Sequence, residues 1–343
     1  MKNLYIGLVL IMGLFFVSCR KNNVKKTAAV TPTIYVAGYE RNASGVPVAT
    51  LWTNGVATTL IDSANVGNAG GLFVNGTDVY VAGSNGQANS KALLWKNGVA
   101  TTLTDGNYNA GAGSVFVSGT DVYVVGNYFS GYTTTPIVWK NGIPTTLPAA
   151  ANAATAAMYV NGTDVYVVGN ILSPGSTIAE LWKNGVGTNL SNGTVQEDVP
   201  ESVFVSGSDV YVVGYETNPG NTYLLAKFWK NGVATNLTDS THIADAHSVF
   251  VCGTDVYVAG QEVNSSGIDV AILWKNGVPT SLSDGTIESY ANSVYVNGSD
   301  VYVAGGRVPG NGSITTPELW KNGVETDLTD GTRDAHVYSL FVK

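Results

Sequence analysis

The chain is poor in the residue types that most often carry out catalysis. Its 343 residues include three histidines and two cysteines, and only 12% of them are charged. It has no G-x-S-x-G phrase of a hydrolase, no glycine-rich phosphate-binding loop, and no cysteine or histidine spacing typical of a metal site. These absences favour a protein that is not an enzyme. No catalytic residue, metal ligand or cofactor is therefore assigned from the sequence.

Basic residues are also outnumbered. Seventeen lysines and arginines stand against 25 aspartates and glutamates, which gives a formal net charge of −8. A negative field of this kind repels nucleic acid, anionic lipid and sulfated glycans. The charge therefore excludes a nucleic-acid partner. It is compatible with a neutral glycan, a basic peptide, a protein ligand or a divalent cation, and equally with an acidic surface that serves only solubility.

Long apolar runs are missing except at the N-terminus. Residues 4–17 form an apolar run that is too short to span a membrane and has the layout of a secretory signal. The phrase Phe-Val-Ser-Cys over residues 16–19 resembles a bacterial lipobox, which implies cleavage after Ser18 and lipidation of Cys19. The alternative is an ordinary signal peptide with an incidental cysteine. We expect a lipoprotein signal peptide over residues 1–18, a flexible tether over residues 19–32 and a folded domain over residues 33–343.

What the sequence does contain is one phrase repeated seven times. Leu-Trp-Lys-Asn-Gly-Val recurs with small changes every 43–47 residues and accounts for all seven tryptophans. The tryptophans are Trp52, Trp95, Trp139, Trp182, Trp229, Trp274 and Trp320. A fixed period in the forties, built from short β-type runs, is typical of the blades of a β-propeller.

Each repeat contains four β-type runs that are rich in valine, tyrosine and threonine. In the third unit these runs are residues 114–117, 120–125, 137–140 and 143–147, with Ser118-Gly119 and Asn141-Gly142 between the outer pairs. Such dipeptides between β-type runs indicate tight hairpins, and type I′ turns need the positive φ that Asn and Gly tolerate. The unit is therefore expected to be a four-stranded antiparallel blade.

The two ends of the chain predict how the ring closes. The folded part starts with residues 34–38, which match the second run of a repeat, and ends with residues 339–343, which match the first. Joining the ends completes a blade from three N-terminal strands and one C-terminal strand. A closed ring leaves no open edge for aggregation. We therefore predict an all-β, seven-bladed propeller that is monomeric.

The repeated aromatic residues could either pack between blades or stack against sugars. One tryptophan on the third run and one tyrosine on the second recur in every unit. A residue that is needed identically in all blades is most simply explained by packing between blades. The tyrosines are Tyr35, Tyr80, Tyr123, Tyr166, Tyr211, Tyr257 and Tyr302.

The divergent segments between the repeats are where function is expected, because a rigid scaffold can position variable loops. These segments hold 17 acidic residues and five basic ones, whereas six aspartates and six lysines cancel at the hairpins. An Asp-Ala-His phrase occurs twice, and paired carboxylates could serve a carbohydrate-active enzyme. The candidates for a ligand-binding face are Glu197, Asp198, Glu201, His242, Asp245, His247, Asp334 and His336.

From Thr33 to the end, the repeats resemble those of β-propeller lipoproteins common in Bacteroidetes-type bacteria. Ser18-Cys19-Arg20-Lys21 is similar to the processing sites of those proteins. The resemblance implies export and an outer-membrane lipid anchor, on the periplasmic side or at the cell surface, and it implies no particular activity. We therefore expect a non-catalytic, membrane-anchored module whose acidic loop face binds a glycan, peptide or protein, with a carbohydrate-active enzyme as the alternative.

Overall fold

The computed structural model describes residues 31–62, 65–86, 89–148, 152–173, 175–191, 197–217, 223–239, 241–310, 312 and 314–343. The expected signal peptide, Cys19 and most of the tether lie outside these residues and stay predictions. Within the described ranges, no helix is long and apolar enough to cross a membrane.

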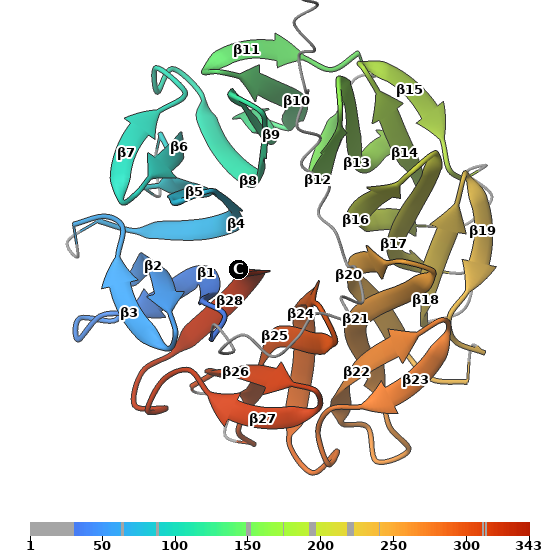
Figure 1. The fold of residues 1–343 in the computed structure, drawn as a ribbon. Helices are drawn as coiled ribbons and strands as arrows, with labels where there is room; N and C mark the ends of the chain where they lie inside the picture. The colour runs from blue at the N-terminus through green and yellow to red at the C-terminus, as the bar shows by residue number, and fades with distance from the viewer. Residues whose placement is uncertain are drawn as a thin grey trace, which may run out of the picture.

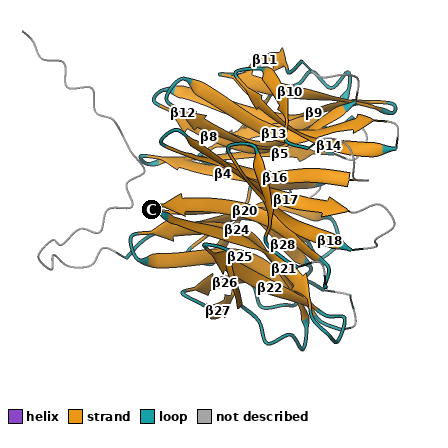
Figure 2. Cartoon of the chain, turned by 90° about the vertical axis from the view of Figure 1, so that its right-hand side faces the viewer, coloured by secondary structure: helices purple, strands orange, loops and turns teal. Residues whose placement is uncertain are grey.

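The described residues form seven four-stranded antiparallel blades around a central axis (Figure 1). Five blades are separate sheets, and blades 4 and 5 are joined into one sheet by a single parallel bridge between Thr177 and Glu197. Seen from the side, the strands run between the two faces of the ring of blades (Figure 2). This confirms the predicted fold class.

The strands are named by their place in the blade, and each group below runs from blade 1 to blade 7. The inner strands are β28 (Ala335–Val342), β4 (Gly67–Asn75), β8 (Asn109–Ser118), β12 (Ala153–Asn161), β16 (Glu197–Ser206), β20 (Ala244–Cys252) and β24 (Glu288–Asn297). The second strands are β1 (Ile34–Arg41), β5 (Asp78–Asn85), β9 (Asp121–Ser130), β13 (Asp164–Ser173), β17 (Asp209–Thr217), β21 (Asp255–Val263) and β25 (Asp300–Val308). The third strands are β2 (Pro47–Thr53), β6 (Lys91–Lys96), β10 (Thr133–Lys140), β14 (Ser176–Lys183), β18 (Leu224–Lys230), β22 (Asp269–Lys275) and β26 (Thr316–Lys321). The outer strands are β3 (Val56–Thr59), β7 (Val99–Thr102), β11 (Ile143–Thr146), β15 (Val186–Asn189), β19 (Val233–Asn236), β23 (Val278–Ser281) and β27 (Val324–Asp327).

Blade 1 closes the ring as predicted. The C-terminal strand β28 pairs antiparallel with β1, from Ile34 opposite Val342 to Glu40 opposite Ala335. Backbone hydrogen bonds in both directions between Thr33 and Lys343 extend this pairing to the end of the chain. Three N-terminal strands and one C-terminal strand therefore share one sheet.

The two sets of hairpins use different turns. Between the third and outer strands, asparagine and glycine both have positive φ, as at Asn54 (49°) and Gly55 (80°), which fits the predicted type I′ turn. Between the inner and second strands, Asn75 still pairs with Asp78, so the two turn residues are Gly76 and Thr77. Glycine alone has positive φ there, at 58° for Gly76. A type II′ turn, which places glycine first, explains this difference from the prediction.

The repeated tryptophans pack between blades. All seven are at most 1% exposed, and each hydrophobic cluster joins residues of two neighbouring blades. In one such cluster Trp182 of blade 4 packs with Tyr123, Val125 and Leu147 of blade 3. The packing interpretation of the tryptophans is therefore confirmed, and burial on this scale supplies much of the free energy of folding.

Candidate functional site

A β-bulge interrupts the inner strand of every blade. The pairing with the second strand skips one residue at the same place in each repeat, and bulges of this kind redirect side chains. The bulged residues, in order around the ring, are Gly70, Gly113, Ala156, Glu201, His247, Asn292 and Tyr338.

A glycine on the second strand makes room for each bulge. A Cβ placed on Gly214 would lie only 1.9 Å from the carbonyl oxygen of Val199, in the inner strand just before the bulge. Glycines at the matching position of the other six blades meet the inner strand at 1.9–2.1 Å. The glycine that follows the Val-Tyr-Val phrase of the second strand by two residues (Ile-Tyr-Val in blade 1) is therefore required by the bulge beside it.

The bulged residues surround a cavity on the propeller axis. The cavity has a volume of about 500 Å³, and all seven bulged residues line it. Figure 1 shows the inner strands that carry these residues facing the centre of the ring. At the bulge position three consecutive blades have only Gly70, Gly113 and Ala156, which we call the small sector, although Leu72 and Met158 of these blades also line the cavity. The next four contribute Glu201, His247, Asn292 and Tyr338, which we call the polar sector.

A closed ring of aromatic side chains lies three residues beyond the bulges, toward the hairpins. Each aromatic side chain contacts the aromatic side chain of the next blade, and the centroids of the two side-chain rings lie 4.5–5.4 Å apart. Such tilted pairs are favourable beyond their buried area. The members are Phe73, Phe116, Tyr159, Phe204, Phe250, Tyr295 and Phe341. These contacts connect the inner strands of all seven blades around the axis.

Serine hydroxyls fasten neighbouring blades just behind the polar sector. Ser202 accepts a hydrogen bond from the backbone N–H of Val249 at 3.3 Å, and Ser248 accepts one from Val294 at 3.2 Å. Ser293 accepts one from Leu340 at 3.1 Å in the same way. These contacts hold the bulges of the polar sector in fixed relation to one another, so the site is built in advance of any ligand.

Two carboxylates and one imidazole lie near one another in blades 5 and 6, on the side that faces the axis. Oδ1 of Asp245 lies 3.5 Å from Nε2 of His247, and the Asp245 side chain is 15% exposed. Burial raises the pKa of Asp245, although His247 opposes the shift. Burial likewise raises the pKa of Glu201, with His247 lowering it and Asp245 raising it. The two acids therefore share one electrostatic environment with His247.

A second cluster lies where blades 7 and 1 meet. The His336 ring stacks on Tyr39 with centroids 4.9 Å apart, and its Nδ1 lies 3.1 Å from the Tyr290 hydroxyl. Nε2 of His336 lies 3.3 Å from Asp334, which accepts a hydrogen bond of 2.9 Å from Arg41. Burial lowers the pKa of His336 despite Asp334, and burial with Tyr338 nearby raises the pKa of Tyr39 to about 12.

The structure divides the residues that the sequence singled out. Glu201 and His247 line the axial cavity, Asp245 lies against His247, and Asp334 and His336 belong to the second cluster beside Tyr338. Glu197 is exposed and lies outside the cavity lining. His242 contacts Thr241 and Glu262 and joins neither cluster.

The expectation that these residues lie in loops is wrong for most of them. Glu197, Asp198 and Glu201 are in β16, Asp245 and His247 are in β20, and His336 is in β28. The inner strands extend past the bulge, and the extra residue breaks the alternation by which a strand is recognised in a sequence. The sequence reasoning also missed Asn292 and Tyr338. Aligning the repeats at the Val-Tyr-Val-x-Gly phrase and asking which inner-strand position varies would have found them.

Asp198 is buried rather than solvated. It is 2% exposed, and its Oδ1 has no hydrogen-bond partner among the described residues. Burial raises its pKa to about 6, with Glu216 also raising it and the Ser191 hydroxyl and Lys227 lowering it. Asp198 is therefore a destabilising feature of blade 5 and not part of an exposed binding face.

Asp198→Asn should consequently stabilise the protein at neutral pH. Because the folded-state pKa is raised, the folded state binds the proton more tightly than the unfolded chain does. The contribution of Asp198 to stability is thus full below about pH 4 and is lost as the pH rises to about 6. We expect Asp198→Asn to gain about 2 kcal/mol over the parent at pH 7 and much less at pH 4. Urea unfolding at both pH values tests this, and a gain that is equal at both pH values would contradict it. Asp105→Asn, which changes an exposed aspartate, is the control.

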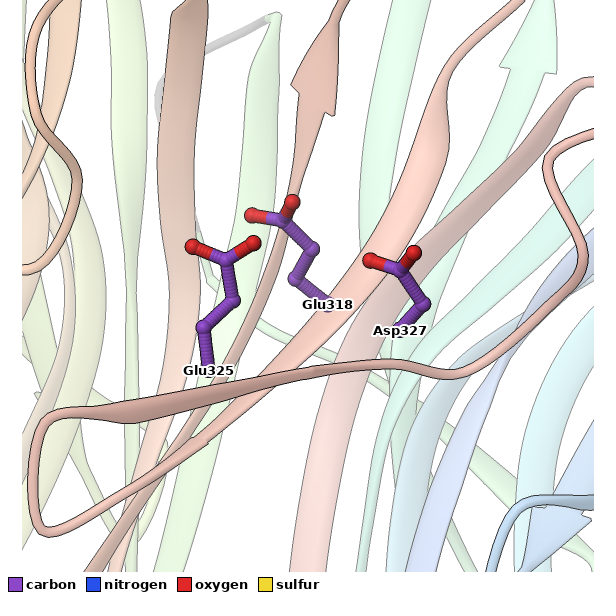
Figure 3. Close-up of side chains that lie close together, drawn as sticks. All are labelled: Glu318, Glu325 and Asp327. Atoms are coloured by element: carbon purple, nitrogen blue, oxygen red, sulfur yellow. The ribbon is translucent and has the colours of Figure 1, made fainter.

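Three acidic residues of blade 7 approach one another closely but do not form a free metal site. Figure 3 shows Glu318, Glu325 and Asp327 side by side, and one oxygen of each lies within 4.8 Å of the others. The Arg307 guanidinium binds all three, at 2.6 Å to Glu318 and 3.0 Å to each of the others. Burial and Glu325 raise the pKa of Glu318 even so. An arginine thus occupies the position that a cation would take.

Comparison with known proteins supports the fold only. No protein-family model and no curated protein matches the sequence. A puromycin-hydrolyzing peptidase of Mycobacterium tuberculosis is similar in structure, with a TM-score of 0.59 and 12% identity over 88% of this chain and 52% of that one. An acylaminoacyl peptidase of Pyrococcus horikoshii gives a TM-score of 0.55 and 12% identity over the same shares. A prolyl endopeptidase gives 0.51 and 14% over 91% of this chain and 50% of that one. The chain therefore spans about half the length of these peptidases, and at this identity the likeness establishes a shared propeller-like architecture.

Proposed function

We propose that the protein is a non-catalytic binding module that takes its ligand into the axial cavity. The observation that carries the proposal is the division of the cavity wall. Seven bulges have the same backbone arrangement, yet three present almost no side chain and four present Glu201, His247, Asn292 and Tyr338. A scaffold without a ligand has no need for this asymmetry, whereas a pocket with room on one side and polar groups on the other suits recognition.

The setting of the module is part of the same proposal. Lipidation of Cys19 would hold the propeller at a membrane through the tether of residues 19–32. In this proposal the protein is exported to the outer membrane, on its periplasmic side or at the cell surface, and works as a monomer. Changing Cys19→Ser should release the protein from the membrane fraction, and continued association with washed membranes would contradict the anchor.

A carbohydrate-active enzyme is the second candidate. Glu201 and Asp245 both have raised pKa values and flank His247, which favours acid–base chemistry at this place. Against it, only Glu201 of these two acids lines the cavity, whereas a glycosidase needs both carboxylates beside the substrate. Hydrolysis of nitrophenyl glycosides that is lost in Glu201→Gln would favour the enzyme over the binding module.

A cavity-filling substitution in the small sector tests the proposed function. Gly113 has ordinary backbone angles, and a Cβ there would lie 3.6 Å from its nearest neighbour, the carbonyl oxygen of Ala156. Gly113→Phe should therefore fold normally while its ring fills the cavity. We expect ligands found by screening glycan and peptide arrays to lose at least about tenfold in affinity, with stability within about 0.5 kcal/mol of the parent.

Ala57→Phe is the matched control, because it adds the same ring on the exposed outer strand β3. Array ligands should bind this variant as they bind the parent. Ligands that bind Gly113→Phe and the parent equally well would place the binding site elsewhere and overturn the proposal.

A further inference from the structure

We propose that the ligand of the axial cavity carries a protonated amine, which Glu201 binds with support from Asp245 and His247. This inference rests on the proposed function, because it names the chemical class of the ligand for the same site. The amine would be the N-terminus or a lysine side chain of a peptide, and the rest of the ligand would lie along the small sector.

The first argument is the charge of the cavity wall. Glu201 lines the cavity, and Asp245 lies directly behind His247. None of the described residues that line the cavity is a lysine or an arginine. Two carboxylates against one imidazole leave this wall negative whether or not His247 is protonated. A cationic group would therefore be attracted to it.

The second argument is that neither acid has a lysine or arginine partner. Oδ1 of Asp245 is buried and makes no hydrogen bond within the described residues, and the ionisable group beside it is His247, with Nε2 at 3.5 Å. Glu201 makes no ion pair with any described lysine or arginine, whereas Glu318, buried in blade 7, is paired with Arg307. A carboxylate taken out of water without a partner is costly. An ammonium group would supply the missing donors.

The third argument separates an amine from a metal ion. The only described group of three His, Cys, Asp or Glu side chains whose ligand atoms lie within 4.8 Å of one another is that of blade 7. The ligand atoms of Glu201, Asp245 and His247 therefore do not all lie within 4.8 Å of one another, and as arranged they do not enclose one ion. An ammonium group on a carbon chain can donate its hydrogen bonds to one or two of these residues, and it does not need all three to surround it. Tyr338 of blade 1, which is 40% exposed, adds an aromatic ring to the lining of the same cavity, and aromatic rings attract cations.

Binding of an amine should be coupled to proton release. Glu201 faces Asp245 and His247 of β20, and Tyr215 of β17 lies close to both acids. Asp245 in turn faces Asp269 of β22. A bound cation favours the ionised form of Glu201 and so lowers its raised pKa. Affinity should therefore fall as the pH is lowered through the pKa of Glu201, and protons should be released on binding in that range.

The experiment is calorimetric titration of the full-length protein with trilysine amide and with its fully N-acetylated form. The two peptides have the same length and backbone, but the acetylated one lacks every amine charge. We expect trilysine amide to bind at least about tenfold more tightly. Glu201→Gln and Asp245→Asn should each reduce its affinity by about tenfold or more, and Asp105→Asn should not change it. Two buffers of different ionisation enthalpy would report the protons released.

The outcomes distinguish this inference from the proposed function. Equal binding of both peptides, or unchanged affinity in Glu201→Gln, would overturn the amine inference. If neither peptide binds while a neutral glycan binds and is blocked by Gly113→Phe, the cavity is a binding site but its ligand is not an amine. If Gly113→Phe changes no binding at all, the cavity proposal itself fails. Thermal melting of each variant shows that loss of binding is not loss of folding.

Discussion

Deletion of residues 337–343 should unfold the protein or leave it barely folded. These residues form most of β28, which completes blade 1 by pairing with β1. Val337, Leu340 and Val342 are at most 5% exposed, and burial of each contributes about 1.5–3 kcal/mol. Phe341 also belongs to the aromatic ring. The expected loss of about 5 kcal/mol or more is comparable to the whole stability of an ordinary domain.

Circular dichroism and thermal melting measure this effect. Lys343→Ala is the control, because it removes only an exposed side chain and keeps the backbone pairing of the C-terminal strand, including the hydrogen bonds to Thr33. A synthetic peptide of residues 335–343, added to the truncated protein, should restore the native spectrum by filling the place of β28. A truncated protein that melts within a few degrees of the parent would refute closure of the ring by the C-terminal strand.

Trp182→Ala should cost about 3–5 kcal/mol of stability. Trp182 is fully buried between blades 3 and 4, and its indole N–H donates a hydrogen bond of 2.9 Å to the carbonyl oxygen of Pro148. The substitution leaves a large cavity between the blades and removes this hydrogen bond. Chemical denaturation of the variant and the parent gives the difference directly.

Tyr132→Ala is the matched control, because this tyrosine is fully exposed in the turn after β9. It should change stability by no more than about 0.5 kcal/mol. If Trp182→Ala instead kept the parent's stability and abolished ligand binding, the tryptophans would be stacking platforms. The protein would then be a multivalent lectin with one site per blade.

The repeat explains why so much of the fold followed from the sequence. Each Trp, and each Asn-Gly between a third and an outer strand, occurs at one structural position, and seven copies of a pattern reinforce a prediction that one copy would leave uncertain. The incomplete first and last units determined the closure between Ile34 and Val342. Local chemistry was sufficient for the turns and the tryptophans, because a type I′ turn requires residues that tolerate positive φ and a large apolar side chain is most stable when buried.

The bulges explain why the site did not follow in the same way. An extra residue in each inner strand moved Glu201 and His247 from expected loops into strands that face the axis. The sequence shows only that these positions vary, and the same variation occurs in loops without function.

The sequence by itself thus determined the blades, their number and the packing role of the tryptophans, because these depend on contacts that each repeat makes in the same way. Only the tertiary structure brought Glu201, His247, Asn292 and Tyr338 to one wall, since they lie about 45 residues apart in the chain and meet only when the ring closes. Burial of Asp198 and the binding of three acids by Arg307 were likewise decided by packing. The formal charge of a residue does not reveal whether water or another residue surrounds it.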